Sequence, residues 1–484
     1  MCMNSSRSNR FQPVEIGRID GKRVVLETVP EQMTAIGGAS MLAAIEKKNG
    51  LVGELSRRVN DERAPHMVNH NTFDILMQRV LQIGTGFADG NDCDWLRNDP
   101  GILMGLDRNP GDGQPGASQE TVSRFESKAI NKKNAKKMRE IFIDYYIAKQ
   151  KKRPKKIELD CDGSMFKTYG AQEGSVYRGG KYGRQMYFPL KILSGQNLLA
   201  TVLRRGDQSE SKTILPELKM AVGKLRAKWP GLRIKARFDS AFGSAELYQW
   251  LRKNKIDYEI GLRPNKVLDF NAQAFMDEAE AQFRAQYGEP RFIGKNGNKK
   301  YQEEHAWIRG LPNNKERIKM EKELTHRRVR VVGDFCYKAE SWEHGERVIC
   351  RIDYTDKGLD VRYVVVSQQN GVPQTIYEEE YCKRGLAEQQ IGGFKQIGQK
   401  LSAQEFYANQ FRLIMYGVAY TLIKQLRDFM RGTFKYAEVN TVRKVLMLMP
   451  MVVRQMKKKI VLQISETHAH CREFLQTWRR LSTA

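Results

Sequence analysis

Apolar residues recur at helical spacing over much of the first 150 residues. The clearest case is a group of side chains three and four positions apart: Phe73, Leu76, Met77, Val80 and Leu81. Asn71 or Thr72 can cap this helix, and Gly84 can end it. A further helix is predicted over residues 118–133. Residues 1–150 are therefore expected to form a mainly helical domain.

The pattern changes at residue 157 to the alternation of a strand. In the segment IELDCD, apolar residues face one side, while Glu158, Asp160 and Asp162 face the other. Further strands are predicted over residues 185–193, 197–204, 232–239 and 256–262, and helices over residues 211–228 and 244–254. This order predicts an α/β sheet covered by helices, as in the ribonuclease H-like fold. Residues 151–263 are expected to form the first part of that core.

The second half of the chain carries a weaker pattern. Residues 264–370 contain short β-like segments among many charged residues, and we predict a β-rich insertion there. Residues 371–430 have a helical pattern and are expected to complete the core. Residues 431–484 are predicted to be a basic helical C-terminal region.

The chain carries a large excess of positive charge. It has 82 Lys and Arg against 56 Asp and Glu, which gives a formal net charge of +26. Such an excess favours a polyanionic partner, and DNA is the leading candidate because each neutralised phosphate releases a counterion. An anionic membrane surface is the alternative. It usually requires a basic amphipathic helix or a lipid anchor, and the sequence has neither.

The cysteines and the apolar runs bear on where the protein works. The seven cysteines are scattered and never form a C-x-x-C pair, which indicates free thiols in a reducing compartment. No apolar run reaches 18 residues, and the first ten residues have no apolar core. Neither a transmembrane helix nor a signal peptide is therefore expected. We expect a cytoplasmic, nucleoid-associated protein.

The strongest local signal is YCKRGLAEQQIGGFK, residues 381–395. Four of its residues carry distinctive chemistry: Tyr381, Arg384, Glu388 and Lys395. At about 100° per residue, their spacing places all four on one narrow stripe of a helix. Cations on such a stripe can grip phosphates while the carboxylate binds a metal ion. The alternative is an exposed helix with an Arg384–Glu388 ion pair, but three glycines make the segment a poor helix by itself.

Two aspartates end predicted strands, Asp162 the first strand and Asp239 the strand over residues 232–239. Side chains at the carboxyl ends of neighbouring strands meet at one edge of an open sheet. Together with Glu388 they could bind two hard cations, Mg²⁺ or Mn²⁺, which would assist phosphodiester displacement. Asp239 could instead cap the next helix. Asp160 shares a face with Asp162 and is an alternative first ligand.

Several segments of the chain, including these motifs, resemble a known protein family. The matching segments are FADGNDCDWLRNDP (87–100), ASQETVSRFE (117–126), DCDGSMFKTYGAQEG (160–174), RFDSAFG (237–243) and the complete residues 381–395. They resemble bacterial insertion-sequence transposases of the DDE class, in the subgroup with a Tyr-Arg-Glu-Lys signature. Within that subgroup, the chain looks most like the insertion-sequence family numbered thirteen-eighty.

The resemblance implies a ribonuclease H-like catalytic core with a β insertion, Mg²⁺ dependence, and assembly of at least two protomers on DNA. It implies cleavage at terminal inverted repeats and strand transfer into target DNA. Three carboxylates are expected to bind metal: Asp162, Asp239 and Glu388. Three side chains are expected to contact phosphates: Tyr381, Arg384 and Lys395. Asp162 is preferred to Asp160 because Gly163 and Ser164 follow it, as in the family.

The helical domain of residues 1–150 is expected to bind DNA. Further DNA contacts are expected from Arg124, on the helix over residues 118–133, and from Lys155 and Lys156, at the end of a basic run. Two other functions fit the same residues. One is a metal-dependent nuclease or resolvase on the same fold, and the other is a catalytically inactive DNA-binding regulator. Trp307 and Trp342 are expected to belong to the core of the insertion, with stacking on an unpaired base as the alternative.

Overall fold

The computed structural model describes residues 11–180, 182–294, 296–398 and 400–483. The chain divides into two units. The terminal unit contains described residues from 1–130, 393–398 and 415–484, and the sheet unit contains those from 131–392 and 399–414. Two helices, α16 (Arg384–Ile397) and α17 (Phe406–Arg427), contribute residues to both units.

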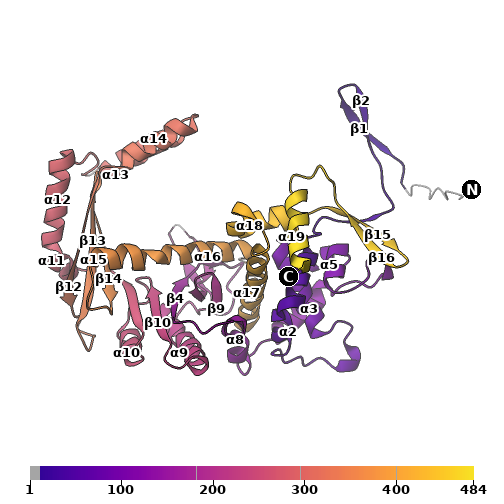
Figure 1. Cartoon of the computed structure of the whole chain (residues 1–484), viewed down its shortest axis with the longest axis horizontal. Coiled ribbons are helices and arrows are strands. Elements are labelled where there is room, and N and C mark those ends of the chain that lie inside the picture. The colour runs from indigo at the N-terminus through magenta and orange to yellow at the C-terminus, as the bar shows by residue number, and fades with distance from the viewer. Residues whose placement is uncertain (1–10, 181, 295, 399, 484) are drawn as a thin grey trace, which may run out of the picture. The chain divides into compact units, whose positions relative to one another are not determined.

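An eight-stranded mixed sheet lies at the centre of the sheet unit, in the order β12-β13-β14-β11-β10-β4-β8-β9 (Figure 1). Its strands are β4 (Lys156–Gly163), β8 (Leu190–Ser194), β9 (Asn197–Val202), β10 (Arg233–Phe238), β11 (Asp257–Leu262), β12 (Arg328–Tyr337), β13 (Glu346–Thr355) and β14 (Gly358–Val366). The strands β4, β10 and β11 are parallel neighbours, and the other pairs are antiparallel. This sheet confirms the α/β class.

Two helices precede parallel strands: α9 (Glu210–Lys228) lies between β9 and β10, and α10 (Ala245–Lys253) lies between β10 and β11. Figure 1 shows both on the lower side of the sheet. Their buried residues form one core with Ile157, Leu159 and Cys161 of β4, so the predicted alternation of this strand is confirmed. The opposite side chains of β4 are charged, which leaves this part of the other face of the sheet without an apolar surface.

The remaining elements of the sheet unit lie outside the main sheet. Residues 184–194 form two short strands rather than the single one predicted, because β7 pairs in a separate sheet ordered β5-β7-β6. The further elements are β5 (Phe166–Lys167), β6 (Val176–Arg178), β7 (Arg184–Tyr187), α7 (Ala135–Arg139), α8 (Ile141–Lys149) and α15 (Pro373–Thr375).

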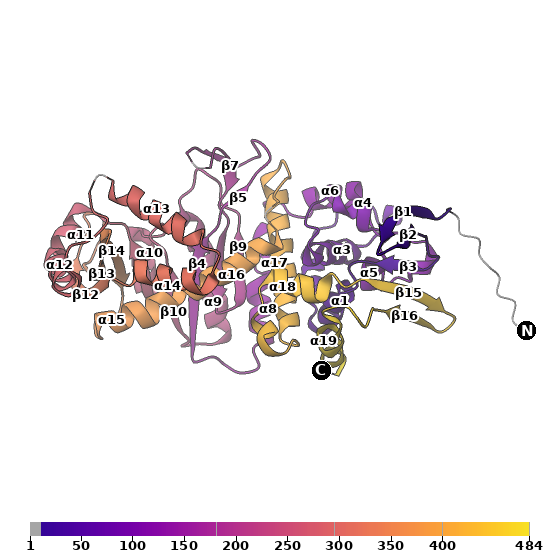
Figure 2. The same ribbon diagram turned by 90° about the horizontal axis from the view of Figure 1, so that it is seen from above.

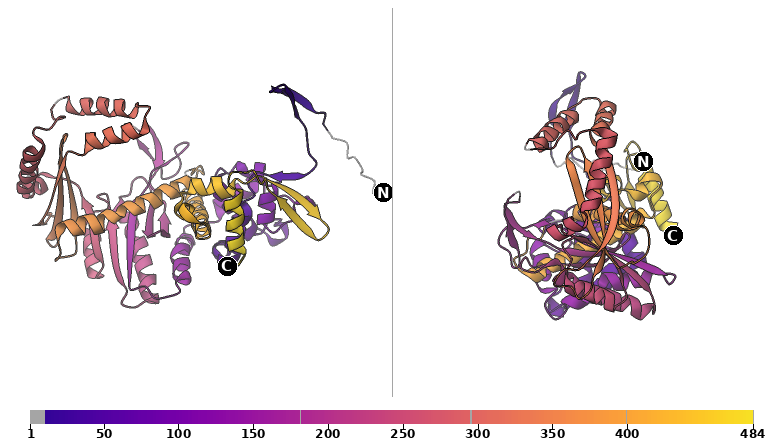
Figure 3. Two further views of the ribbon diagram at one scale, coloured as in Figure 1. Left: turned by 45° about the horizontal axis from the view of Figure 1, so that its top comes forward. Right: turned by 90° about the vertical axis from the view of Figure 1, so that its left-hand side faces the viewer.

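The expected β-rich insertion over residues 264–370 is helical in its first part. Four helices precede the strands: α11 (Lys266–Asn271), α12 (Gln273–Tyr287), α13 (Gly297–Arg309) and α14 (Asn314–Thr325). The strands β12–β14 then extend the main sheet. Figure 3 shows α13 and α14 as a helical pair. Among the described residues, the small core of this pair consists of Ile308 and Leu324 with Phe292, which precedes α13, and the partly buried Tyr301 and Met320. So few apolar positions leave a weak helical pattern, which explains the wrong prediction.

The two tryptophans of this region differ from each other. Trp342 packs against Tyr248, with ring centroids 4.7 Å apart, and against Tyr337 at 5.4 Å. Trp307 on α13 is 59% exposed. The prediction of a core position was therefore right for Trp342 and wrong for Trp307.

The terminal unit is mainly helical and includes two small sheets, a hairpin and the sheet β16-β15-β3, drawn in Figure 2. Its elements are β1 (Val14–Ile19), β2 (Lys22–Leu26), β3 (Gln32–Thr34), α1 (Ala39–Asn49), α2 (Leu51–Ser56), α3 (Thr72–Thr85), α4 (Asp92–Leu96), α5 (Pro100–Gly105), α6 (Gln119–Lys128), α18 (Val439–Val442), β15 (Met451–Met456), β16 (Lys459–Gln463) and α19 (Cys471–Thr483). The last 54 residues were predicted to be helical, yet they contain two strands. Their alternation is short, and besides its hairpin partner β16, β15 pairs with β3, which lies more than 400 residues earlier in the chain.

The predicted helix around residues 73–81 is confirmed as α3, with Asn71 as its cap and Gly86 rather than Gly84 at its end. A buried ion pair ties α3 to α6: Arg79 Nε lies 3.0 Å from Glu126 Oε1, and both side chains are 2% exposed. In the described part of the chain, no helix is long and apolar enough to cross a membrane.

Candidate functional site

The first aspartate of interest stands at the end of β4. Asp162 lies on the charged face of this strand, and its side chain is 14% exposed. Its Oδ1 accepts the N–H of Gly163 at 2.7 Å. Because β4 and β10 are parallel and in register from Lys156 opposite Arg233 to Cys161 opposite Phe238, their carboxyl ends reach the same edge of the sheet.

Asp239 follows β10 directly at this edge. Its Oδ1 accepts the N–H of Ala241 at 2.7 Å, which closes a tight turn. The helix α10 begins only at Ala245, and Ser244 caps it by accepting the N–H of Leu247. The alternative role of Asp239 as the cap of that helix is therefore wrong.

The segment that carries Glu388 enters its helix irregularly. A π-helical turn covers Ile376–Glu380, a 3-10 turn covers Tyr381–Lys383, and α16 begins at Arg384. The single regular helix assumed from Tyr381 onward is therefore wrong at its first turn. Arg384, Glu388 and Lys395 do share α16, as predicted.

Tyr381 is packed against the turn that follows β10. Its hydroxyl lies 2.9 Å from where a Cβ on residue 261 would stand, so Gly261 makes room for it. Burial raises the pKa of Tyr381 to about 12, while the nearby guanidinium of Arg384 acts in the opposite direction. The phenol is therefore a neutral hydrogen-bonding group near neutral pH.

Arg384 links two of the three carboxylates. Its Nη1 donates to Asp162 Oδ2 at 3.0 Å, and its Nη2 donates to Glu388 Oε1. Burial raises the pKa of Asp162, Arg384 lowers it, and the negative charges of Asp239 and Glu388 raise it further. The negative charges of Asp239 and Glu388 thus both act on Asp162, and a cation beside Asp162 would relieve that repulsion.

The donor set suits a hard divalent cation, because it offers carboxylate oxygens alone. In the structure as described, however, no three Asp, Glu, His or Cys side chains already converge as metal ligands. The guanidinium of Arg384 lies between Asp162 and Glu388 instead. A metal ion at this place would have to displace or share those two contacts.

The alternative first ligand, Asp160, is already committed to another partner. It is 3% exposed, and its two oxygens accept Nε and Nη2 of Arg237 at 2.6 and 2.9 Å. A bidentate pair of this kind leaves little capacity for a metal ion. The geometry therefore favours Asp162 over Asp160.

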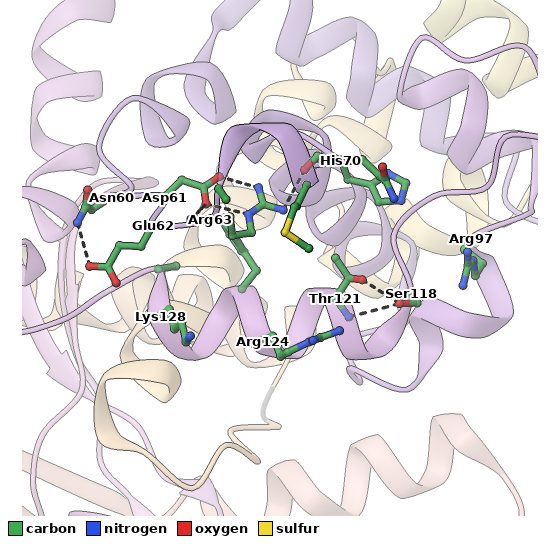
Figure 4. A pocket seen from close by; sticks show the side chains of 15 residues that line it. Asn60, Asp61, Glu62, Arg63, His70, Arg97, Ser118, Thr121, Arg124 and Lys128 are labelled. Atoms are coloured by element: carbon green, nitrogen blue, oxygen red, sulfur yellow. Dashed lines mark hydrogen bonds and ion pairs between the residues drawn. The ribbon is translucent and has the colours of Figure 1, made fainter.

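Three of the predicted DNA contacts, Arg124, Lys155 and Lys156, are exposed. Lys155 and Lys156 are exposed at the start of β4, and Lys156 pairs with Glu158 at 3.1 Å. In the terminal unit, Arg124 pairs with Glu120 and lines a cavity of about 670 Å³ (Figure 4). The cavity is also lined by Arg63, Arg97, His70 and Lys128. Lys395 is half-buried on α16, in the part assigned to the terminal unit.

Sequence reasoning missed two buried cations beside the site, Lys235 and Arg237 of β10. The signal was present, because they alternate with apolar residues just as the acidic residues of β4 do. Both contact Glu380, the residue that ends the π-helical turn before Tyr381.

Residues 16–484 match the family model described as the transposase DDE domain of group 1. No curated protein matches the chain in sequence. One similar solved structure is the "Cryo-EM structure of piggyBac transposase synaptic complex with hairpin DNA", at 10% identity, with 84% of this chain and 80% of that chain covered and a TM-score of 0.39. The family model extends over nearly the entire sequence, and the chain belongs to the transposases with a DDE domain of group 1.

Proposed function

We propose that this transposase cleaves DNA at the terminal inverted repeats of its element and transfers the strand to target DNA, with Asp162, Asp239 and Glu388 as the catalytic carboxylates. One observation carries the assignment. Arg384 bridges Asp162 and Glu388, while the charge of Asp239 acts on the pKa of Asp162. These interactions support the proposal that three carboxylates, from two strand ends and one helix, act together at this edge of the sheet.

Asp162, Asp239 and Glu388 would hold Mg²⁺ or Mn²⁺, and two ions are expected. Ions held in this way supply activation of the attacking oxygen and stabilisation of the leaving oxygen. The chain's own cations contribute separately. Arg384 has a guanidinium that can move from carboxylate to phosphate, and Tyr381 offers a neutral hydroxyl close to Asp239. Lys395 is proposed to contact a phosphate further along the same strand.

The proposal extends to the biological setting. The Tyr-Arg-Glu-Lys spacing supports a bacterial insertion-sequence origin near the family numbered thirteen-eighty. The net charge of +26 supports binding of double-stranded DNA. We propose Arg124, Lys155 and Lys156 as contacts to the DNA backbone. Two or more protomers are proposed to assemble on the DNA, as a nucleoid-associated complex. The ribonuclease H-like description of the core is part of the same proposal.

The test uses purified protein, a labelled duplex with the terminal repeat of the flanking element, and a plasmid target. Label should join the plasmid in Mg²⁺ and not in EDTA. Glu388→Gln, Asp162→Asn and Asp239→Asn should each abolish both cleavage and joining yet keep most DNA affinity, because phosphate contacts dominate binding. Glu379→Gln alters an exposed carboxylate of the same segment and serves as the matched control.

The outcomes separate the proposal from its two alternatives. Cleavage without joining would identify a nuclease or resolvase. Tight binding without cleavage in any divalent metal would identify a DNA-binding regulator. Loss of DNA binding in all three carboxylate variants would assign those residues a structural role instead.

A further inference from the structure

The face of β10 under the segment of residues 376–388 is charged rather than apolar. Lys235 and Arg237 alternate with Ile234, Ala236 and Phe238, which belong to the buried core on the other face. The side chains of the two cations are only 6% and 5% exposed. Buried cations are costly unless each is paired and hydrogen-bonded. The partners of Lys235 and Arg237 therefore show which segments pack against this face of β10.

Lys235 bridges two acidic residues from different parts of the chain. Its Nζ donates to Glu259 Oε1 of β11 at 2.5 Å and also to a carboxylate oxygen of Glu380. Burial raises the pKa of Glu259 to about 7, although Lys235 acts to lower it. Burial of the Glu259 carboxylate costs desolvation free energy. Lys235 connects this carboxylate to that of Glu380.

Arg237 holds the same residue by its backbone. Its Nε and Nη2 are occupied by Asp160 of β4, and its Nη1 donates to the carbonyl oxygen of Glu380 at 3.1 Å. Glu158 Oε2 lies 3.2 Å from Arg237 Nη2. Glu380 is therefore fixed at two points, its carboxylate by Lys235 and its carbonyl by Arg237.

Glu380 stands where the helical geometry changes. It is the last residue of the π-helical turn, and the 3-10 turn of Tyr381–Lys383 follows. A π-turn leaves carbonyl groups outside the regular helical ladder, and such turns are frequent at functional sites. A third contact holds the same turn from β12, where Arg330 Nη1 donates to Glu378 Oε1 at 2.8 Å. Arg384 and Glu388 follow Glu380 by four and eight residues.

We propose that Lys235 and Arg237 are positioning residues, which fix Glu380 and thereby set where α16 starts and where Glu388 stands relative to Asp162 and Asp239. The proposal rests on the proposed function, since it assigns these cations a purpose in the same reaction. Neither residue contacts the three carboxylates in the described structure. They act through the turn that precedes the helix.

Arg237→Lys is the sharpest test. Lysine keeps the positive charge beside Asp160, but it lacks the planar fork that serves Asp160 and the Glu380 carbonyl together. Arg291→Lys is the matched control, because this arginine pairs with the buried Asp356 at 2.8 Å elsewhere in the same unit. Each full-length variant is compared with wild type in single-turnover cleavage, terminal-repeat affinity and amide hydrogen exchange of residues 380–392.

The expected result for Arg237→Lys is a cleavage rate lower by about 10- to 100-fold, as for a small displacement of a catalytic group. Its DNA affinity should match wild type, and exchange should rise in residues 380–392. The control should change none of the three. Glu380→Gln removes only the negative charge that pairs with Lys235 and should give a smaller loss with the same exchange pattern, which keeps the test usable if Arg237→Lys does not fold.

Three results would overturn the inference: wild-type cleavage by Arg237→Lys, unchanged exchange at the start of α16, or equal effects in Arg291→Lys. Failure of the proposed function would look different. In that case, wild type itself would not cleave in any divalent metal, whereas the exchange comparison would still report whether Arg237 holds the turn.

Discussion

Removal of the positive charge of Arg384 should strengthen metal binding and weaken catalysis. Arg384 donates to Asp162 and Glu388, the same oxygens that are proposed to hold a divalent cation. A metal ion must compete with this guanidinium. Arg384→Gln removes the competing positive charge and leaves all three carboxylates in place. The two consequences therefore have opposite signs, which a general loss of structure would not produce.

The magnitude follows from the contact with Asp162. The two side chains are 18% and 14% exposed and are joined at 3.0 Å. A hydrogen bond between charged groups contributes about 1.5–3 kcal/mol. Since about 1.4 kcal/mol corresponds to a factor of ten in affinity, the variant should bind metal roughly 10- to 100-fold more tightly. The contact with Glu388 adds little, because that side chain is 56% exposed and its ion pair is screened by solvent.

The assay is calorimetric titration of Mn²⁺ into DNA-free protein, with cleavage measured separately. Arg233→Gln removes one exposed positive charge from the start of β10 and controls for the change in net charge. It should leave Mn²⁺ affinity within about twofold of wild type, since exposed charges are screened. Equal or weaker Mn²⁺ binding by Arg384→Gln would refute the reasoning, because Arg384 would then not compete for the carboxylates.

Three further predictions concern the terminal unit. Glu126→Gln leaves Arg79 buried without its counter-charge and should lower the free energy of unfolding by about 3–5 kcal/mol. The loss is measured as a lower midpoint of denaturant unfolding, and a midpoint shift as small as that of a surface variant would contradict the prediction. The hydrogen bonds from Arg63 lower the pKa of Asp61 to about 2, so this carboxylate stabilises the fold above about pH 4, and the stabilisation is lost as the pH falls towards 2. Thermal unfolding of Arg63→Gln should therefore depend less on pH in that window than that of wild type. Arg124→Gln should reduce the slope of log affinity against log salt by about 0.9 if this side chain neutralises one phosphate, and an unchanged slope would remove it from the interface.

The sequence predicted those elements in which apolar and polar side chains alternate regularly along the chain. The strict alternation of residues 157–162 placed Asp162 on the correct face of β4, because side chains in a strand have a period of two. Asp239 was likewise placed at the end of its strand. Each prediction needed only local information, and each describes an element whose apolar face joins the main core.

Elements with few buried residues were predicted poorly. The helices α13 and α14 bury little beyond Ile308 and Leu324, so the hydrophobic pattern on which helix prediction depends is nearly absent. The irregular entry to α16 could not be predicted for another reason. It depends on contacts between Glu380 and side chains about 145 residues earlier, which no local pattern reveals.

These contacts also explain why a sheet would keep charges beneath a helix that is proposed to carry a catalytic carboxylate. Apolar packing is non-directional, so a helix on an apolar face can shift with little change in buried area. Charge-assisted hydrogen bonds depend on distance and angle, and each requires its own partner. Lys235 and Arg237 use two different atoms of Glu380, so a displacement of the turn would lengthen at least one of these hydrogen bonds. The alternation of cations along β10 thus specifies the place of one turn. Glu388 follows that turn by eight residues, so its position relative to Asp162 would depend on the same two cations.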